Sequence, residues 1–130
     1  MSRQSLRRFL VAPGGALSGR VRVPGDKSIS QRPSLLGALA DGVTRIQGFL
    51  EGEDSLATLM AFRAMGVKID GPENGRVVVQ GVGMHGLKAP ATVLDLGNSG
   101  TSMRLLCGLL SGQEFDVELV GDHSLMSRPM

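Results

Sequence analysis

Two segments of the chain share one pattern, in which a short strand leads through a polar, glycine-containing turn into an apolar helix. The first segment covers residues 20–40 and the second covers residues 92–110. A strand that runs through a tight turn into a helix is a basic unit of proteins that mix helices and strands. The likeness lies in the pattern and not in residue identities, so it does not establish an internal repeat. It predicts the α/β class, in its α+β form.

The composition limits what can fill the core of such a fold. Hydrophobic residues make up 42% of the 130 residues, but only four residues are aromatic, all of them phenylalanine. The core must therefore be built mainly from Leu, Val, Ile, Met and Ala. This is an ordinary composition for a globular domain of this length, and one domain is the expectation.

The charge pattern and the hydropathy pattern exclude several kinds of partner. The net charge is only +2 and the sequence offers no aromatic platform for base stacking, so we predict no nucleic-acid binding. No apolar run approaches the ~20 residues that a membrane span needs, so we predict no membrane partner. The apolar patch in residues 1–15 is shorter than the core of a secretion signal, and we predict a cytoplasmic protein.

Helical spacing, alternation and turn residues predict the order of the elements. Ser30 is the preferred N-cap of the first helix, because Pro33 then falls in the first turn, where its missing N–H costs nothing. Ser28 is the alternative cap, in a capping box with Gln31. Asp54 or Ser55 is expected to cap the second helix, which ends at Gly66. The predicted strands cover residues 20–23, 44–50, 67–70, 76–80, 93–96 and 115–120, with helices over 30–40, 54–66 and 101–110 and a polar tail without structure over 121–130.

Lys27, Ser28 and Arg32 stand together where the first helix begins. The free N–H groups and the dipole of a helix N-terminus favour an anion, and these three side chains add two cations and a hydroxyl donor. By spacing alone, a capped helix with two solvated cations is the preferred interpretation. An anion site is the alternative.

The stretch LGNSGTSMR, residues 96–104, is a second candidate at another helix start. Its glycines allow close approach of the backbone to a ligand, and Asn98, Ser99 and Thr101 supply polar groups. It fits neither the phosphate loop of nucleotide-binding enzymes nor the dinucleotide-binding glycine pattern. This stretch can be interpreted either as a tight turn or as a cradle for an anion, and the residues alone do not decide between the two. The two stretches together would suit a substrate with several negative charges.

The remaining reactive side chains carry weaker signals. Cys107 lies in an apolar run and is predicted to be a buried core residue. With one cysteine and two distant histidines, His85 and His123, we predict no metal site.

Four stretches of the sequence occur in the order and spacing of a known family. They are VPGDKSISQR, EGEDSLATLMAFRAMGV, LGNSGTSMRLL and GDHSLMSRPM. Together they closely resemble the opening part of the 5-enolpyruvylshikimate-3-phosphate synthases. The resemblance implies the enolpyruvyl transferase fold, built from repeated βαβαββ units. It also implies transfer of the enolpyruvyl group of phosphoenolpyruvate to the 5-hydroxyl of shikimate 3-phosphate, with no metal or organic cofactor.

The resemblance also implies roles for individual residues. Lys27 matches a catalytic lysine that touches both substrates, and Ser28, Arg32 and Thr101 match contacts to shikimate 3-phosphate. The matches for phosphoenolpyruvate are Asn98, the backbone at Gly100, where the herbicide glyphosate also binds, and Arg128. Gln31 and Pro33 depart from the usual residues of the family, and Pro33 leaves the direction of Arg32 open.

Members of this family are much longer, with two domains that close over the substrates. Residues 1–130 correspond to about one repeat unit and part of a second, without the second domain. We therefore expect this chain to be inactive alone and to need the missing C-terminal part. A non-catalytic anion-binding module, or a relative of the enolpyruvyl transferase that acts on UDP-N-acetylglucosamine, are the alternatives.

Overall fold

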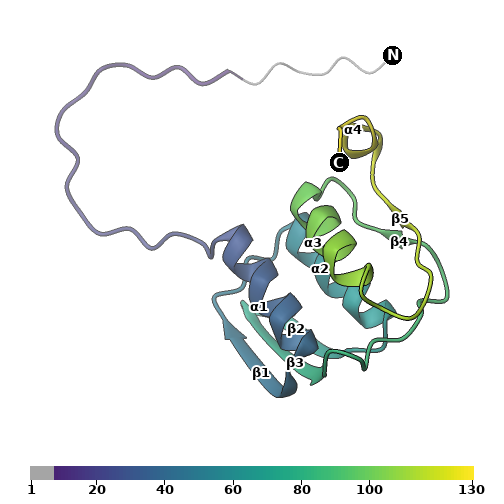
Figure 1. Ribbon diagram of the computed structural model, residues 1–130. Coiled ribbons are helices and arrows are strands. Elements are labelled where there is room, and N and C mark those ends of the chain that lie inside the picture. Colours follow the sequence, from purple (N-terminus) through teal and green to yellow (C-terminus); the bar gives the residue numbers. More distant parts are fainter. Residues whose placement is uncertain (1–7) are drawn as a thin grey trace.

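The computed structural model describes residues 8–130 and has mixed helices and strands, as predicted (Figure 1). Residues 1–7 lie outside the described part. The prediction about a secretion signal used residues 1–15, so about half of that stretch is not described. The elements are α1 (Lys27–Leu39), β1 (Asp41–Gln47), α2 (Glu53–Ala64), β2 (Lys68–Glu73), β3 (Arg76–Val82), β4 (Leu94–Asp95), α3 (Gly100–Leu110), β5 (Leu119–Val120) and α4 (His123–Met126).

The larger sheet is antiparallel with the strand order β1-β3-β2, and α1 and α2 pack against it. The predicted hairpin between β2 and β3 is confirmed. Asn74 and Gly75 at its tip both have positive φ, 52° and 71°, which is the geometry of a type I′ turn. The smaller sheet pairs β4 with β5 in parallel, and α3 connects these two strands.

The end of α2 was predicted at Gly66, and the structure confirms it. Gly66 has a φ of 89°, which glycine adopts without strain. Its N–H donates to the Arg63 carbonyl and the N–H of Val67 donates to the Phe62 carbonyl, each at 3.0 Å. These two bonds form a Schellman motif, which satisfies carbonyls that the helix end leaves free.

Within residues 8–130, the core is one cluster that joins the large sheet to α1, α2, α3 and α4. As the composition predicts, its members are mostly aliphatic, with only two phenylalanines among the buried apolar side chains. Their burial removes apolar surface from water, which is the main favourable term in folding. The most deeply buried large members are Phe62, Leu59, Met65, Leu96, Leu106, Leu125, Val77 and Val79.

The predicted strand over residues 20–23 is absent from the structure. This segment is exposed and belongs to an extended arm that leaves the body of the molecule before α1 (Figure 1). A strand needs a neighbouring strand for its backbone hydrogen bonds, and residues 8–130 provide none for this segment. The alternation of Arg and Val alone therefore gave a wrong prediction.

The predicted N-caps of α1 and α2 are also wrong. Helix α1 begins at Lys27, and the carboxylate of Asp26 caps it by accepting from the N–H of Ile29 at 2.7 Å. This cap places Pro33 inside the helix. Helix α2 is preceded by Gly52, so Asp54 lies within its first turn.

The C-terminal tail was predicted to lack structure, but it contains the single-turn helix α4. Asp122 caps this helix by accepting from the N–H of Leu125 at 2.7 Å, and the Leu125 side chain is fully buried. The tail contains a capping residue and one apolar anchor, which are too short a signal for periodicity to detect.

Cys107 was predicted to be buried, but it is exposed. It follows the buried Leu106 on α3, and one residue along a helix turns the side chain by about 100°. Only one side of the apolar run in α3 faces the core.

Candidate anion-binding site

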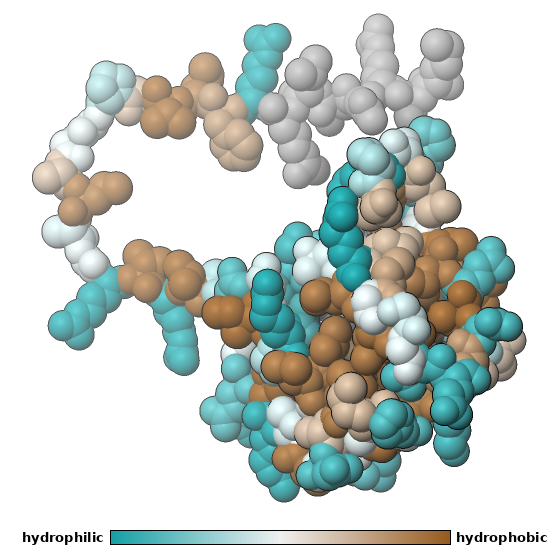
Figure 2. Space-filling view, in the orientation of Figure 1, coloured by the Kyte–Doolittle hydropathy of each residue, from teal (hydrophilic) through white to brown (hydrophobic). Residues whose placement is uncertain are grey.

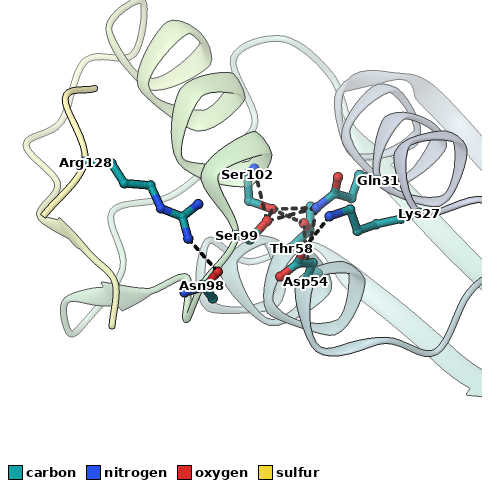
Figure 3. A network of polar contacts seen from close by, with 8 residues as sticks. All are labelled: Lys27, Gln31, Asp54, Thr58, Asn98, Ser99, Ser102 and Arg128. Carbon is teal, nitrogen blue, oxygen red and sulfur yellow. Dashed lines mark hydrogen bonds and ion pairs between the residues drawn. The ribbon is translucent and has the colours of Figure 1, made fainter. Parts of the chain in front are cut away.

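The first turns of α1, α2 and α3 meet at one place in the structure. Lys27 in α1 contacts Asp54 in α2, and Gln31 in α1 contacts Ser99 and Ser102 at the start of α3 (Figure 3). Each helix N-terminus carries partial positive charge on its free N–H groups. Three such ends in contact create a local environment that favours a negatively charged ligand.

Lys27 is the cation at the centre of this arrangement. Its Nζ lies 2.8 Å from Oδ2 of Asp54, and its side chain is half exposed while that of Asp54 is 23% exposed. The dipole of α2 also stabilises the Asp54 carboxylate in the first turn. An ion pair with this exposure is weak, so an incoming anion can compete with Asp54 for the lysine.

Four buried polar side chains lie beneath the ion pair (Figure 3). The amide nitrogen of Gln31 lies 3.0 Å from Oγ of Ser99 and 2.9 Å from Oγ of Ser102. Oγ of Ser102 lies 2.6 Å from both Oγ of Ser99 and Oγ1 of Thr58. Sequence reasoning did not assign Gln31 or Thr58 to this cluster, because no local pattern shows that residues 27 positions apart share one buried network.

Arg128 is held on the other side of α3 by a second network (Figure 3). Its Nη2 donates to Oδ1 of Asn98 at 3.0 Å and to the Ser124 hydroxyl at 3.1 Å. The amide nitrogen of Asn98 donates to both carboxylate oxygens of Asp122, at 2.9 and 2.8 Å. The hydrogen bonds from the Leu125 N–H and from Asn98 lower the pKa of Asp122 from its ordinary value, and the charge of Arg128 adds to this effect.

Gly100 lies between the two networks as the first residue of α3. A Cβ atom added at Gly100 would lie 3.8 Å from Nη1 of Arg128 and 3.6 Å from the Leu125 side chain. The backbone of Gly100 and the guanidinium of Arg128 therefore face each other at short range. Thr101 follows in the same first turn and is half-buried.

Ser28 and Arg32 are near the site in sequence but make contacts of another kind. Nη1 of Arg32 donates to the carbonyl of Ser28 at 2.9 Å, so the two residues are bonded within α1 and not to α2 or α3. Arg32 is exposed. Of the residues singled out from sequence, the structure joins Lys27, Asn98, Ser99 and Arg128 to the two networks by hydrogen bonds or an ion pair, but it does not join Ser28, Arg32 or Thr101 to them.

Two hollows of the surface lie away from these residues. One hollow of about 520 Å³ lies between α3 and residues 113–119, and another lies at the β2–β3 hairpin; neither is lined by Lys27, Gly100 or Arg128. Within residues 8–130, no three His, Cys, Asp or Glu side chains are grouped to hold a metal ion. No helix in this part of the chain is long and apolar enough to cross a membrane.

The fold and the site thus define an α/β domain in which a lysine and an arginine flank converged helix N-termini. The profile of one family, "EPSP synthase (3-phosphoshikimate 1-carboxyvinyltransferase)", matches residues 11–130. The chain belongs to this family.

Individual relatives agree with the family match. A 3-phosphoshikimate 1-carboxyvinyltransferase of Alkalilimnicola ehrlichii is 74% identical over 94% of this chain and 27% of that protein. The enzyme of the same name from Nitrosococcus oceani is 66% identical over 98% of this chain and 29% of that protein. The solved EPSP synthase from Acinetobacter baumannii superposes with a TM-score of 0.83 at 64% identity, over 86% of this chain and 26% of that one. The chain therefore spans about a quarter of the length of these relatives.

Proposed function

We propose that this chain forms part of the substrate site of an enolpyruvyl transferase. The reaction transfers the enolpyruvyl group of phosphoenolpyruvate to the 5-hydroxyl of shikimate 3-phosphate and releases phosphate, on the route to chorismate. The observation that supports this most directly is the meeting of three helix N-termini beside Lys27. Both substrates are phosphorylated carboxylates, which this electrostatic environment favours. A cytoplasmic location goes with this biosynthetic role.

We assign the residues in two groups on either side of Lys27. Ser28, Arg32 and Thr101 would contact shikimate 3-phosphate, and Asn98, Gly100 and Arg128 would contact phosphoenolpyruvate. Lys27 would contact both substrates. These groups would offset the charges of two anions and orient them, so that catalysis rests on positioning and on electrostatic stabilisation.

The contacts in the structure add one feature to this assignment. The Lys27 ammonium is paired with the Asp54 carboxylate, and the Arg128 guanidinium donates a hydrogen bond to the side-chain oxygen of Asn98. Substrate binding would exchange part of these contacts for contacts to phosphate and carboxylate oxygens. Because both cations are held in place before binding, less side-chain entropy is lost when the substrates arrive.

We further propose that residues 1–130 correspond to about one βαβαββ unit and part of a second. The chain spans about a quarter of the length of its relatives. The rest of the substrate site would therefore come from the part of the enzyme that corresponds to the remaining length of those relatives. The chain alone is expected to show no turnover.

The test is reconstitution with a separately produced remainder taken from a relative. Phosphate release from the two substrates should occur with the mixture and not with either part alone. Lys27→Met should lower the rate by about 10²-fold or more, because a positioned charge is removed from the developing transition state. Lys88→Met removes an exposed lysine of the same kind elsewhere on the surface and serves as control. Turnover by the chain alone would refute the proposed division of the site.

The alternative is a module that binds anions without catalysis. It is favoured by the fact that all three helix N-termini belong to this chain. Calorimetry of the chain alone with shikimate 3-phosphate separates the two functions. Binding by the chain, together with an inactive reconstituted mixture, would support the module over the enzyme.

A further inference from the structure

The buried hydroxyl groups of the site form hydrogen bonds whose directions can be worked out by counting protons. Oγ1 of Thr58 lies 3.0 Å from the carbonyl oxygen of Asp54, which only accepts, so Thr58 donates its single proton there. Thr58 must then accept in its contact with Ser102, so Ser102 donates to Thr58. Since the proton of Ser102 is used, Ser99 must donate to Ser102.

This order leaves one possible role for Gln31. Oγ of Ser99 and Oγ of Ser102 have no proton left for it, so the side chain of Gln31 must be the donor to both of them. Only the amide nitrogen of Gln31 carries N–H groups and can donate, so the nitrogen and not the oxygen faces the serines. The same nitrogen also lies 3.4 Å from the carbonyl oxygen of Asp54, a third acceptor. The amide oxygen, on the other side, is buried and has no partner. Gln31 itself is fully buried, so the orientation of its amide is fixed by the two serines.

The hydrogen bonds connect all three helices and return to the first. They run from Gln31 in α1 to α3, then to Thr58 and Asp54 in α2. The carboxylate of Asp54 holds Lys27, which lies four residues before Gln31 on α1 and therefore on the same face. The first turns of α1, α2 and α3 are thus joined in a closed ring.

We propose that Gln31 is a positioning residue of the site. By donating to Ser99 and Ser102, and through its contact with the Asp54 carbonyl, it links α1 to both α3 and α2 and so fixes Lys27 and the start of α3 relative to each other. It does not touch a substrate. Its effect on ligand binding rests on the proposed function, whereas its effect on the ring does not.

The test compares Gln31→Met with Ser34→Ala in the full chain. Methionine keeps the length of the side chain and also removes the unpaired buried oxygen, so the variant is expected to fold. Ser34 is equally buried on α1, but its hydroxyl donates only to the Ser30 carbonyl of the same helix, 2.8 Å away. Ser34→Ala therefore removes a buried hydroxyl without touching the ring.

The first readout is NMR spectroscopy of the chain without ligand. In the unsubstituted chain and in Ser34→Ala, slowly exchanging hydroxyl protons of Ser99, Ser102 and Thr58 should be visible. In Gln31→Met these protons should exchange faster and the amide signals of Ser99 and Ser102 should shift. Unchanged hydroxyl and amide signals in Gln31→Met would overturn the proposal, whatever the chain binds.

The second readout is the KM for phosphoenolpyruvate in the reconstituted enzyme. Gln31→Met should raise it by roughly tenfold with a smaller change in kcat, because Lys27 and α3 lose their mutual alignment. Ser34→Ala should leave it unchanged. If the unsubstituted mixture is inactive, the proposed function fails, and the NMR comparison still decides the role of Gln31. An active mixture in which Gln31→Met leaves KM unchanged would show that the ring does not position the site.

Discussion

The Lys27 ammonium and the Arg128 guanidinium are each fixed by acidic neighbours while remaining open to solvent. Asp54 holds Lys27 directly, and Asp122 holds Arg128 through Asn98. Freezing a lysine or arginine side chain costs up to about 2 kcal/mol of conformational entropy. Part of that cost is therefore met during folding, and two cations on separate elements are ready for anionic groups.

Adding a single methyl group at Gly100 tests its proposed contact with phosphoenolpyruvate. Its backbone is helical and an added Cβ would meet no atom closer than 3.6 Å, so Gly100→Ala should fold. Its free energy of unfolding should stay the same or rise by up to about 1 kcal/mol, because alanine favours helices. The new methyl group would stand beside Arg128, so in the reconstituted enzyme the KM for phosphoenolpyruvate should rise. Gly108→Ala is the matched control, since it changes the same residue type in α3 with no atom within 4 Å.

At the scale of elements, α4 is a short helix with a large influence on the site. Asp122 provides its N-cap and also the acceptor for Asn98, while Leu125 anchors it in the core. A helix of one turn does not form by itself, since helix nucleation is unfavourable. Packing and capping therefore determine where Arg128 lies, two residues after the end of α4.

The anchoring role of Leu125 predicts a loss of stability on truncation. Leu125→Ala should lower the free energy of unfolding by about 2–3 kcal/mol, because it opens a cavity at a fully buried position. Met126→Ala, at a neighbouring position that is 59% exposed, should have little effect. Urea denaturation of both variants tests this. Equal stability of the two variants would mean that α4 is not docked through Leu125.

At the scale of the whole molecule, the arm before α1 is exposed and extends away from the body. Figure 2 shows apolar residues along the arm as well as on the body. Phe9, Leu10, Val11 and Leu17 are each at least 90% exposed. Contiguous exposed apolar surface promotes association or marks an interaction surface.

The chain is therefore expected to self-associate as its concentration rises. Sedimentation velocity should show a growing fraction of larger species, and Leu10→Ser with Leu17→Ser should reduce it. Met84→Ser, which replaces an exposed apolar residue of the body, is the control. A sharp monomer peak at all concentrations would contradict the expectation.

Local sequence signals correctly predicted the turns and helix ends that depend on only a few neighbouring residues. The Asn74-Gly75 turn and the Gly66 helix end are examples, because glycine at positive φ acts over only a few residues. The same reasoning failed for residues 20–23, because a strand depends on a partner that local sequence does not show. It failed for the start of α1, because the predicted caps were Ser30 or Ser28, whereas the Asp26 carboxylate is the group that accepts from the N–H of Ile29.

The sequence by itself determined the α/β class, the mainly aliphatic core, the family and the two polar stretches at helix starts. These follow from composition, period and motif, each of which is contained in a few neighbouring residues. Only the tertiary structure showed that the first turns of three helices meet, that Asp54 holds Lys27, and that Gln31 joins α1 to α3. Those contacts connect residues 27, 68 and 71 positions apart, and they arise from the packing of the helices against the sheet.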